Sequence, residues 1–206
     1  MPTVDCIIGT AAAGLDRTAC PQASEAIRRS RRRRDLLTDP SQMSEKPLLF
    51  VDVDGVISLF GFPSDRCPPG TWLNVEGMPH LISATAGEHL LGLAEAFELV
   101  WCTGWEERAN EHLVHRLGLP ADLPFLTFTE VPGSAHWKLS AVQRHAGDRP
   151  LAWIDDTFDD SCRAWAARRW APTLLVATEP ATGLCPDHVA ALERWAQTVA
   201  RRGAAS

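Results

Sequence analysis

The sequence lacks several features that would place the chain in a specialised class. It has no apolar run long enough to span a bilayer, and Met1 to Asp5 carries no basic region of the kind that opens a secretory signal. The six cysteines show no C-x-x-C spacing, so neither a zinc site nor a disulfide framework is indicated. We therefore expect a cytoplasmic protein with reduced thiols and no membrane partner. Nothing in the sequence indicates an oligomeric state.

An excess of positive charge is also missing. The formal net charge is −6, and residues 1–42 hold seven of the 20 basic but only five of the 26 acidic side chains. The rest of the chain therefore carries a balance of −8. This balance excludes a bulk electrostatic attraction to nucleic acid, so any such binding would need a local patch.

Residues 1–44 differ in composition from the rest of the chain. Six of the seven positions from Arg28 to Arg34 are arginine, and no hydrophobic period supports a packed element. We expect a disordered N-terminal extension. A nucleic-acid-binding or targeting tail is the alternative. Met43 is a second candidate start of the protein, in which case residues 1–42 would not be translated. Residues 45–206 are expected to form one domain.

Short apolar segments alternate with amphipathic segments from residue 48 onward. This alternation predicts an α/β fold with a doubly wound parallel sheet. The expected strands are 48–53, 99–102, 125–128, 151–154 and 173–176, and the expected helices are 88–97, 105–117, 138–145, 159–169 and 187–202. Residues 56–87 are rich in proline and glycine and predict a loop or β-hairpin over the site. This segment is too short for a globular cap, so we expect only a small flap.

Polar side chains follow several of the expected strands. They are Asp52 and Asp54, Thr103, Lys138, and the pair Asp155 and Asp156. The carboxyl ends of parallel strands meet at one edge of a sheet, so these groups should converge there. Neighbouring carboxylates repel each other, and a cation such as Mg²⁺ would relieve that repulsion. Taken singly, each group has an ordinary explanation as a solvated turn or helix residue.

Four motifs together carry a resemblance to a known family. DVDGV at residues 52–56, TG at 103–104, a lysine and then DD at 155–156 follow apolar strands in that order. The arrangement resembles the haloacid dehalogenase-like (HAD) hydrolase superfamily over about residues 47–180. The run VWCTGWEERAN, with GLP and AWIDD after it, is similar to the HAD domain of Swiss Army Knife RNA repair proteins. The resemblance implies a HAD-type Rossmannoid fold with three α/β/α layers.

The resemblance also implies a role for each residue of the set. Asp52 would be the nucleophile that forms an aspartyl-phosphate, and Asp54 would protonate the leaving oxygen and then activate water. Thr103 and the backbone N–H of Gly104 would bind the phosphate, which Lys138 would neutralise. The metal ligands would be Asp52, the backbone carbonyl of Asp54, Asp155 and Asp156. Which of the last two touches the metal directly is left open, and Asp159 or Asp160 could also serve.

The expected function is that of a Mg²⁺-dependent phosphatase acting on a phosphomonoester. A site without a cap suits a phosphate on a large substrate, such as a polynucleotide end. Trp72, Trp105 and Trp137 lie near the expected site and could stack bases, or they could belong to the core. Two other functions stay open: a non-catalytic binding or regulatory domain with the same fold, and a phosphotransferase.

Overall fold

The computed structural model of the protein describes residues 46–129 and 135–204. These residues belong to one compact unit, Ser44–Ser206. The predicted N-terminal extension, residues 1–44, lies outside the described residues and stays a prediction. No helix in the described part of the chain combines the length and apolar character needed to cross a bilayer.

The centre of the unit is a parallel sheet of four strands in the order β5-β1-β6-β7, counted over the described residues. The strands are β1 (Leu48–Val51), β5 (Glu98–Trp101), β6 (Leu151–Asp155) and β7 (Thr173–Ala177). β1 lies between β5 and β6 and is buried along its whole length. A central strand covered on both faces needs a continuous apolar run, which is what its sequence supplies.

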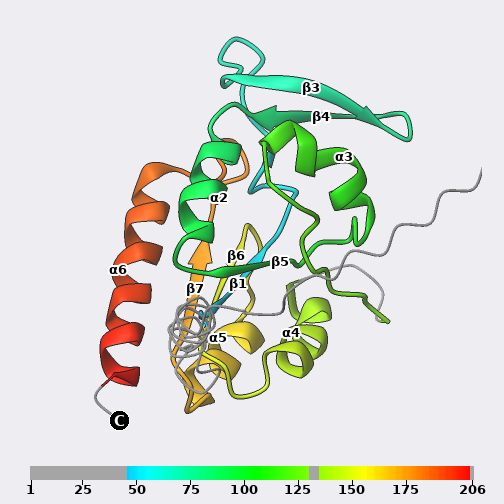
Figure 1. The fold of residues 1–206 in the computed structure, drawn as a ribbon. Helices are drawn as coiled ribbons and strands as arrows, with labels where there is room; N and C mark the ends of the chain where they lie inside the picture. The colour runs from blue at the N-terminus through cyan, green and yellow to red at the C-terminus, as the bar shows by residue number, and fades with distance from the viewer. Residues whose placement is uncertain (1–45, 130–134, 205–206) are drawn as a thin grey trace, which may run out of the picture. The chain divides into compact units, whose positions relative to one another are not determined.

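Helices cover both faces of the sheet (Figure 1). Alternate residues of β1 belong to different cores, because successive side chains of a strand point to opposite faces. Leu49 packs with one set of helices and Phe50 with the other. The first set is α2 (Ala86–Ala94), α3 (Arg108–Leu117) and α6 (Pro186–Gly203); the second is α4 (Leu139–Ala146) and α5 (Asp160–Arg168). The predicted doubly wound, three-layer α/β/α fold is confirmed.

A small antiparallel sheet follows β1 and forms the flap, which we define as residues 58–83. It consists of β2 (Ser58–Leu59), β3 (Gly70–Val75) and β4 (Met78–Ser83) in the order β2-β4-β3. The flap lies beyond the carboxyl ends of the parallel strands (Figure 1). Its turn is joined to α3 by an ion pair of 2.7 Å between Glu76 and Arg108. The predicted hairpin is thus confirmed, with one further short strand.

The strand predicted at 125–128 is wrong. Phe125 makes a single bridge to Trp101, where the Leu126 N–H donates to the Trp101 carbonyl at 2.9 Å. The chain then leaves the sheet, because the Phe128 N–H donates to the Glu106 carboxylate at 2.9 Å instead of to β5. An apolar run predicts that a segment is buried. It does not reveal that the Glu106 side chain accepts the hydrogen bond of the Phe128 N–H, which a strand would direct to its neighbour.

The other predicted elements are present with boundaries within three residues of those expected. The largest shift at the start of a helix is in α3, predicted from residue 105 and observed from Arg108. Glu106 has a φ of 50°, in the left-handed region that a helix cannot contain. Residues 104–107 therefore form a turn, and this turn carries Trp105 to the end of the sheet.

Candidate active site

The turn after β1 is built so that two carboxylates leave the strand in a fixed geometry. The Val53 carbonyl accepts the N–H groups of Ile57 and Ser58, both at 2.8 Å, and so closes the turn. Gly55 has a φ of 72°, and a Cβ placed there would lie 2.6 Å from the side chain of Asp156. Only glycine combines this conformation with this close approach. The Thr178 hydroxyl anchors the turn by donating to the Gly55 carbonyl at 2.9 Å.

Lys138 joins the ends of two strands. Its Nζ lies 2.7 Å from Oδ2 of Asp52 and 2.7 Å from Oδ2 of Asp155. All three side chains are buried, with no more than 7% of their surface exposed. The lysine is the last residue of a 3₁₀ turn, η2 (Ala135–Lys138), and is the N-cap residue of α4. The sequence predicted that Lys138 would meet the paired acids, and the structure brings them together.

Burial and the charges of neighbouring side chains shift the pKa values of Asp52, Asp155 and Lys138 in opposite directions. Burial raises the pKa of Asp52 to about 7, although the nearby Lys138 ammonium opposes the rise. The pKa of Asp155 is raised in the same way, with the same opposing effect. Burial also disfavours the ammonium of Lys138, but the two carboxylates outweigh that cost and hold its pKa above its ordinary value. The single ammonium of Lys138 therefore does not fully offset the cost of burying two ionised carboxylates.

The acids that follow β6 are oriented by their neighbours. Oδ1 of Asp155 accepts the Thr157 N–H at 3.0 Å, and Oδ2 accepts the Trp153 indole N–H at 3.2 Å. Asp156 accepts the Thr157 hydroxyl at 3.0 Å. Oxygen atoms of Asp52, Asp155 and Asp156 all lie within 4.8 Å of one another. This is the only grouping of potential metal ligands among the described residues.

The cluster has the chemistry of a hard divalent cation site. With all groups ionised, three carboxylates and one ammonium leave two negative charges at a largely buried position. Oxygen ligands of this kind suit Mg²⁺. The alternative ligand Asp159 is engaged elsewhere, because it caps α5 by accepting the Cys162 N–H at 3.0 Å. Asp160 is the first residue of α5 and is not part of the cluster.

The Asp54 side chain lies apart from this cluster. Its Oδ2 accepts the indole N–H of Trp105 at 2.9 Å, and its Oδ1 lies 3.5 Å from Nδ1 of His80 on β4. The side chain remains 49% exposed. The structure thus separates the two acids of the DVD motif, with Asp52 buried beside Lys138 and Asp54 at the solvent edge.

Thr103 and Gly104 come directly after β5, as predicted. Thr103 is buried, and its Oγ1 accepts the Trp105 N–H at 3.3 Å. Trp137 lies against Gly104, at 3.6 Å from a Cβ placed on the glycine, and its ring centroid is 5.5 Å from Nζ of Lys138. Phe128 packs edge-on against the Trp137 ring. An aromatic side chain therefore borders the predicted phosphate position.

The three tryptophans that could stack bases have different surroundings. Trp105 is only 7% exposed, so its faces are not available to a base. Trp72 on the flap is 60% exposed, and Trp137 is half-buried. Trp137 is the one that lies against both Gly104 and Lys138, the residues that the family resemblance implies would bind the phosphate.

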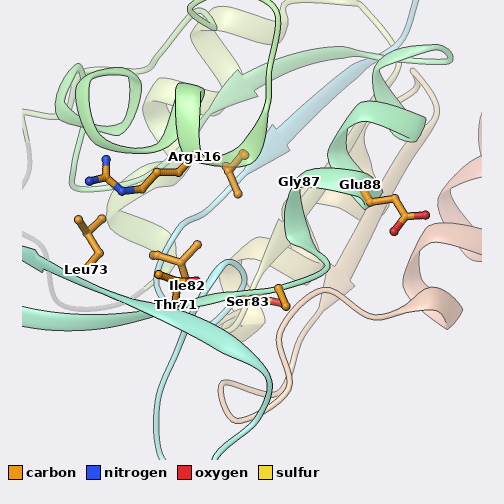
Figure 2. Close-up of a pocket in the computed structure, with 9 residues that line it drawn as sticks. Thr71, Leu73, Ile82, Ser83, Gly87, Glu88 and Arg116 are labelled. Atoms are coloured by element: carbon orange, nitrogen blue, oxygen red, sulfur yellow. The ribbon is translucent and has the colours of Figure 1, made fainter.

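A pocket of about 330 Å³ lies between the flap strands and the helices α2 and α3 (Figure 2). Thr71, Leu73 and Ile82 line it from the flap, and Gly87 and Arg116 line it from the helices. None of the predicted site residues lines this pocket. The candidate active site is instead the acidic cluster at the end of the sheet.

Sequence reasoning missed the contacts that neighbouring side chains make with the site acids and with the turn after β1. His80 shows no ligand spacing, and Thr178 follows β7 without a recognisable motif. Trp105 was expected near the site, as a base-stacking or a core residue, but the sequence does not show that the indole N–H groups of Trp105 and Trp153 donate to Asp54 and Asp155. Only the fold brings these donors to the acids.

One comparison with known proteins extends over most of the chain. Residues 48–189 match the family described as the HAD domain in Swiss Army Knife RNA repair proteins. The chain belongs to this family. The matched range begins with β1 and ends within α6, so the HAD domain contains every predicted site residue. A search of curated proteins found no match.

Proposed function

We propose that this HAD domain is a Mg²⁺-dependent phosphatase that hydrolyses a phosphomonoester through an aspartyl-phosphate on Asp52. The observation that carries the proposal is the position of Lys138, 2.7 Å from both Asp52 and Asp155, beside the one carboxylate cluster of the described residues. A buried cation between acids at the ends of two parallel strands suits the binding of a dianionic phosphate. Such an arrangement stabilises the charge that develops on a transferring phosphoryl group.

The proposed reaction has two steps. In the first, a carboxylate oxygen of Asp52 forms a bond to phosphorus while the bond from phosphorus to the leaving oxygen breaks, and Asp54 gives its proton to that oxygen. In the second, a water molecule attacks phosphorus, Asp54 takes up the proton of the water, and the bond to Asp52 breaks. Thr103 and the Gly104 N–H would hold the phosphate oxygens, and Lys138 would neutralise them.

Asp52, Asp155 and Asp156 are the side chains that would hold Mg²⁺, together with the backbone carbonyl of Asp54. The cluster fits the ion because its three carboxylates exceed the single ammonium by two charges. When bound, the ion supplies charge stabilisation at the transferring phosphate. Asp155 is already held by Lys138, Trp153 and Thr157, which supports Asp156 as the more adaptable ligand.

We further propose that the phosphate belongs to a large substrate, with a polynucleotide end as the leading candidate. The described insertion over the site is only the three-stranded flap, and Asp54 remains half-exposed. Trp137 beside Gly104 offers an aromatic surface next to the phosphate position, where a base could stack. The family description, which names RNA repair proteins, points to the same substrate class.

The test uses Asp52→Asn, which keeps the shape of the side chain but removes the nucleophile. We expect hydrolysis of p-nitrophenyl phosphate with Mg²⁺ to fall by about a thousandfold or more, as for the loss of other covalent nucleophiles. Asp65→Asn on the exposed flap loop is the matched control and should retain wild-type rates.

Three outcomes would contradict parts of the proposal. Equal activity of wild type and Asp52→Asn would contradict the role of Asp52. No wild-type activity on aryl, nucleotide or oligonucleotide phosphates would favour a non-catalytic domain. Release of the phenol without an equal release of inorganic phosphate would identify a phosphotransferase. Assays with 5′- and 3′-phosphorylated oligonucleotides and with free sugar phosphates then test the substrate class.

A further inference from the structure

The surroundings of Asp54 assign different tasks to its two oxygen atoms. Oδ2 accepts the Trp105 indole N–H at 2.9 Å. An indole N–H can only donate a hydrogen bond, so Oδ2 is held as an acceptor. A carbonyl oxygen accepts a hydrogen bond better than a hydroxyl oxygen does, so a proton on the carboxyl group of Asp54 is favoured on Oδ1. The hydrogen bond from Trp105 therefore favours Oδ1 as the oxygen that exchanges a proton.

Trp105 is itself held firmly in place. It is 7% exposed, and its backbone N–H donates to Oγ1 of Thr103 at 3.3 Å. His80 packs edge-on against its ring with centroids 4.7 Å apart, and the ring of His112 on α3 lies on it in a similar way at 6.3 Å. A buried and well-packed donor can fix a side chain that is otherwise half-exposed and would change rotamer freely in solvent.

The flap contributes to the same arrangement through His80. Nδ1 of this residue lies 3.5 Å from Oδ1 of Asp54 and 3.0 Å from Oγ of Ser58 on β2. The ion pair between Glu76 and Arg108 ties the flap turn to α3, the helix that follows Trp105. The flap and the Trp105 turn thus bracket Asp54 from two sides.

We propose that Trp105 is a positioning residue that presents Oδ1 of Asp54 to the leaving oxygen, and that His80 braces this pair from the flap. The inference rests on the proposed function, in which Asp54 is the acid that protonates the leaving group. Phosphorylation of Asp52 still breaks one bond from phosphorus to oxygen and forms one. The hydrogen bond from Trp105 determines the direction from which the proton arrives.

The test compares leaving groups in the variant Trp105→Phe, which keeps an aromatic ring but removes the N–H. An alkyl phosphomonoester needs protonation of its leaving oxygen, whereas p-nitrophenolate leaves without it. We expect kcat/KM for the alkyl ester to fall by about 10- to 100-fold, as when a catalytic group is displaced by about an ångström. For p-nitrophenyl phosphate we expect a change within about twofold, because general acid catalysis adds little there.

Two comparisons separate positioning from a purely structural effect. Trp101→Phe removes another buried indole N–H, which donates to Asn110 at 2.7 Å. This variant should lower kcat/KM for both substrates by the same factor or leave both unchanged. In an Asp54→Ala background, Trp105→Phe should have no further effect on the alkyl ester, because the two residues act as one unit. An equal loss for both leaving groups, or an additive loss in the double variant, would overturn the inference.

A spectroscopic readout is independent of turnover. The indole ¹H–¹⁵N resonance that disappears in Trp105→Phe should shift in Asp54→Ala, whereas the resonance lost in Trp101→Phe should not. An unchanged Trp105 resonance would refute the hydrogen bond even if the protein is an active phosphatase. Conversely, a shifted resonance in a protein whose activity does not depend on Asp52 would confirm the contact, but it would overturn both the proposed function and the positioning role.

Discussion

Lys138 is the residue on which the arrangement of the acids depends most. It places one positive charge between two carboxylates that are almost fully excluded from water. Buried ion pairs add little net stability when intact, but removing one partner leaves uncompensated buried charge. When Asp52 and Asp155 are ionised, the folded state is therefore strongly destabilised unless this lysine or a bound cation offsets their charge.

Lys138→Met tests this dependence. In the absence of divalent cations, we expect the free energy of unfolding to fall by about 3 to 5 kcal/mol at pH 8. Chemical denaturation of wild type and variant measures the difference. Lys46→Met is the matched control, since Lys46 is exposed and its Nζ donates to the Ala94 carbonyl at the surface. This control should change stability by about 0.5 kcal/mol or less.

The effect of Lys138→Met should also depend on pH. The pKa of Asp52 is raised to about 7 in the folded protein, so the folded state binds this proton more tightly than the unfolded chain does. The stability linked to this proton is present at low pH and is lost as the pH rises towards 7. Removing the ammonium that opposes the rise should make the loss larger at pH 8 than at pH 5. A stability difference that is the same at both values would contradict this account.

At the scale of elements, the turn after β1 determines how the carboxyl ends of β1, β6 and β7 meet. Gly55 brings the backbone so close to Asp156 that no Cβ fits, and Thr178 holds the turn from the end of β7. Residues that follow three strands therefore meet at one turn. A change in this turn should alter the proposed cation site and not only overall stability.

Gly55→Ala tests the close approach, with Gly61→Ala as its control. The two glycines have φ angles of 72° and 74°, but a Cβ at Gly61 would meet nothing within 4 Å. We expect both variants to lose about 1 to 2 kcal/mol of stability from the left-handed conformation, and Gly55→Ala to lose more because its Cβ also displaces Asp156. Only Gly55→Ala should also weaken Mg²⁺ binding, measured by titration calorimetry, because it displaces Asp156. Equal Mg²⁺ affinities of the two variants would show that the contact does not matter.

The elements that carry the acids could be predicted from sequence, because an apolar run ending in a carboxylate marks both a strand and its exposed end. The doubly wound fold, the flap and the meeting of Lys138 with Asp52 and Asp155 followed from that pattern and from the family resemblance. The segment 125–128 could not be predicted, because the Glu106 carboxylate diverts its backbone. The hydrogen bond from Trp105 to Asp54 could not be predicted for a related reason, because the burial of an indole does not identify the acceptor of its N–H.

At the scale of the whole molecule, the charge balance limits how the proposed substrate, a polynucleotide end, can be held. Residues 43–206 carry a net negative charge, so a polynucleotide would be held by local contacts near its phosphate rather than by a long basic surface. The Asp54 side chain is half-exposed, so a large substrate could reach it at the carboxyl end of the sheet. Binding of phosphorylated ends should accordingly depend little on the length of the polymer beyond its last few nucleotides.

Trapping of the covalent intermediate tests the central claim most directly. Asp54→Asn should still be phosphorylated by p-nitrophenyl phosphate, whose leaving group needs no proton, but it should hydrolyse the intermediate slowly. After an acid quench, mass spectrometry of proteolytic fragments should find the phosphate on Asp52 when Mg²⁺ is present. It should find none when EDTA replaces the metal. A stoichiometric burst of p-nitrophenolate with no phosphate on Asp52, or with phosphate on another residue, would contradict the account.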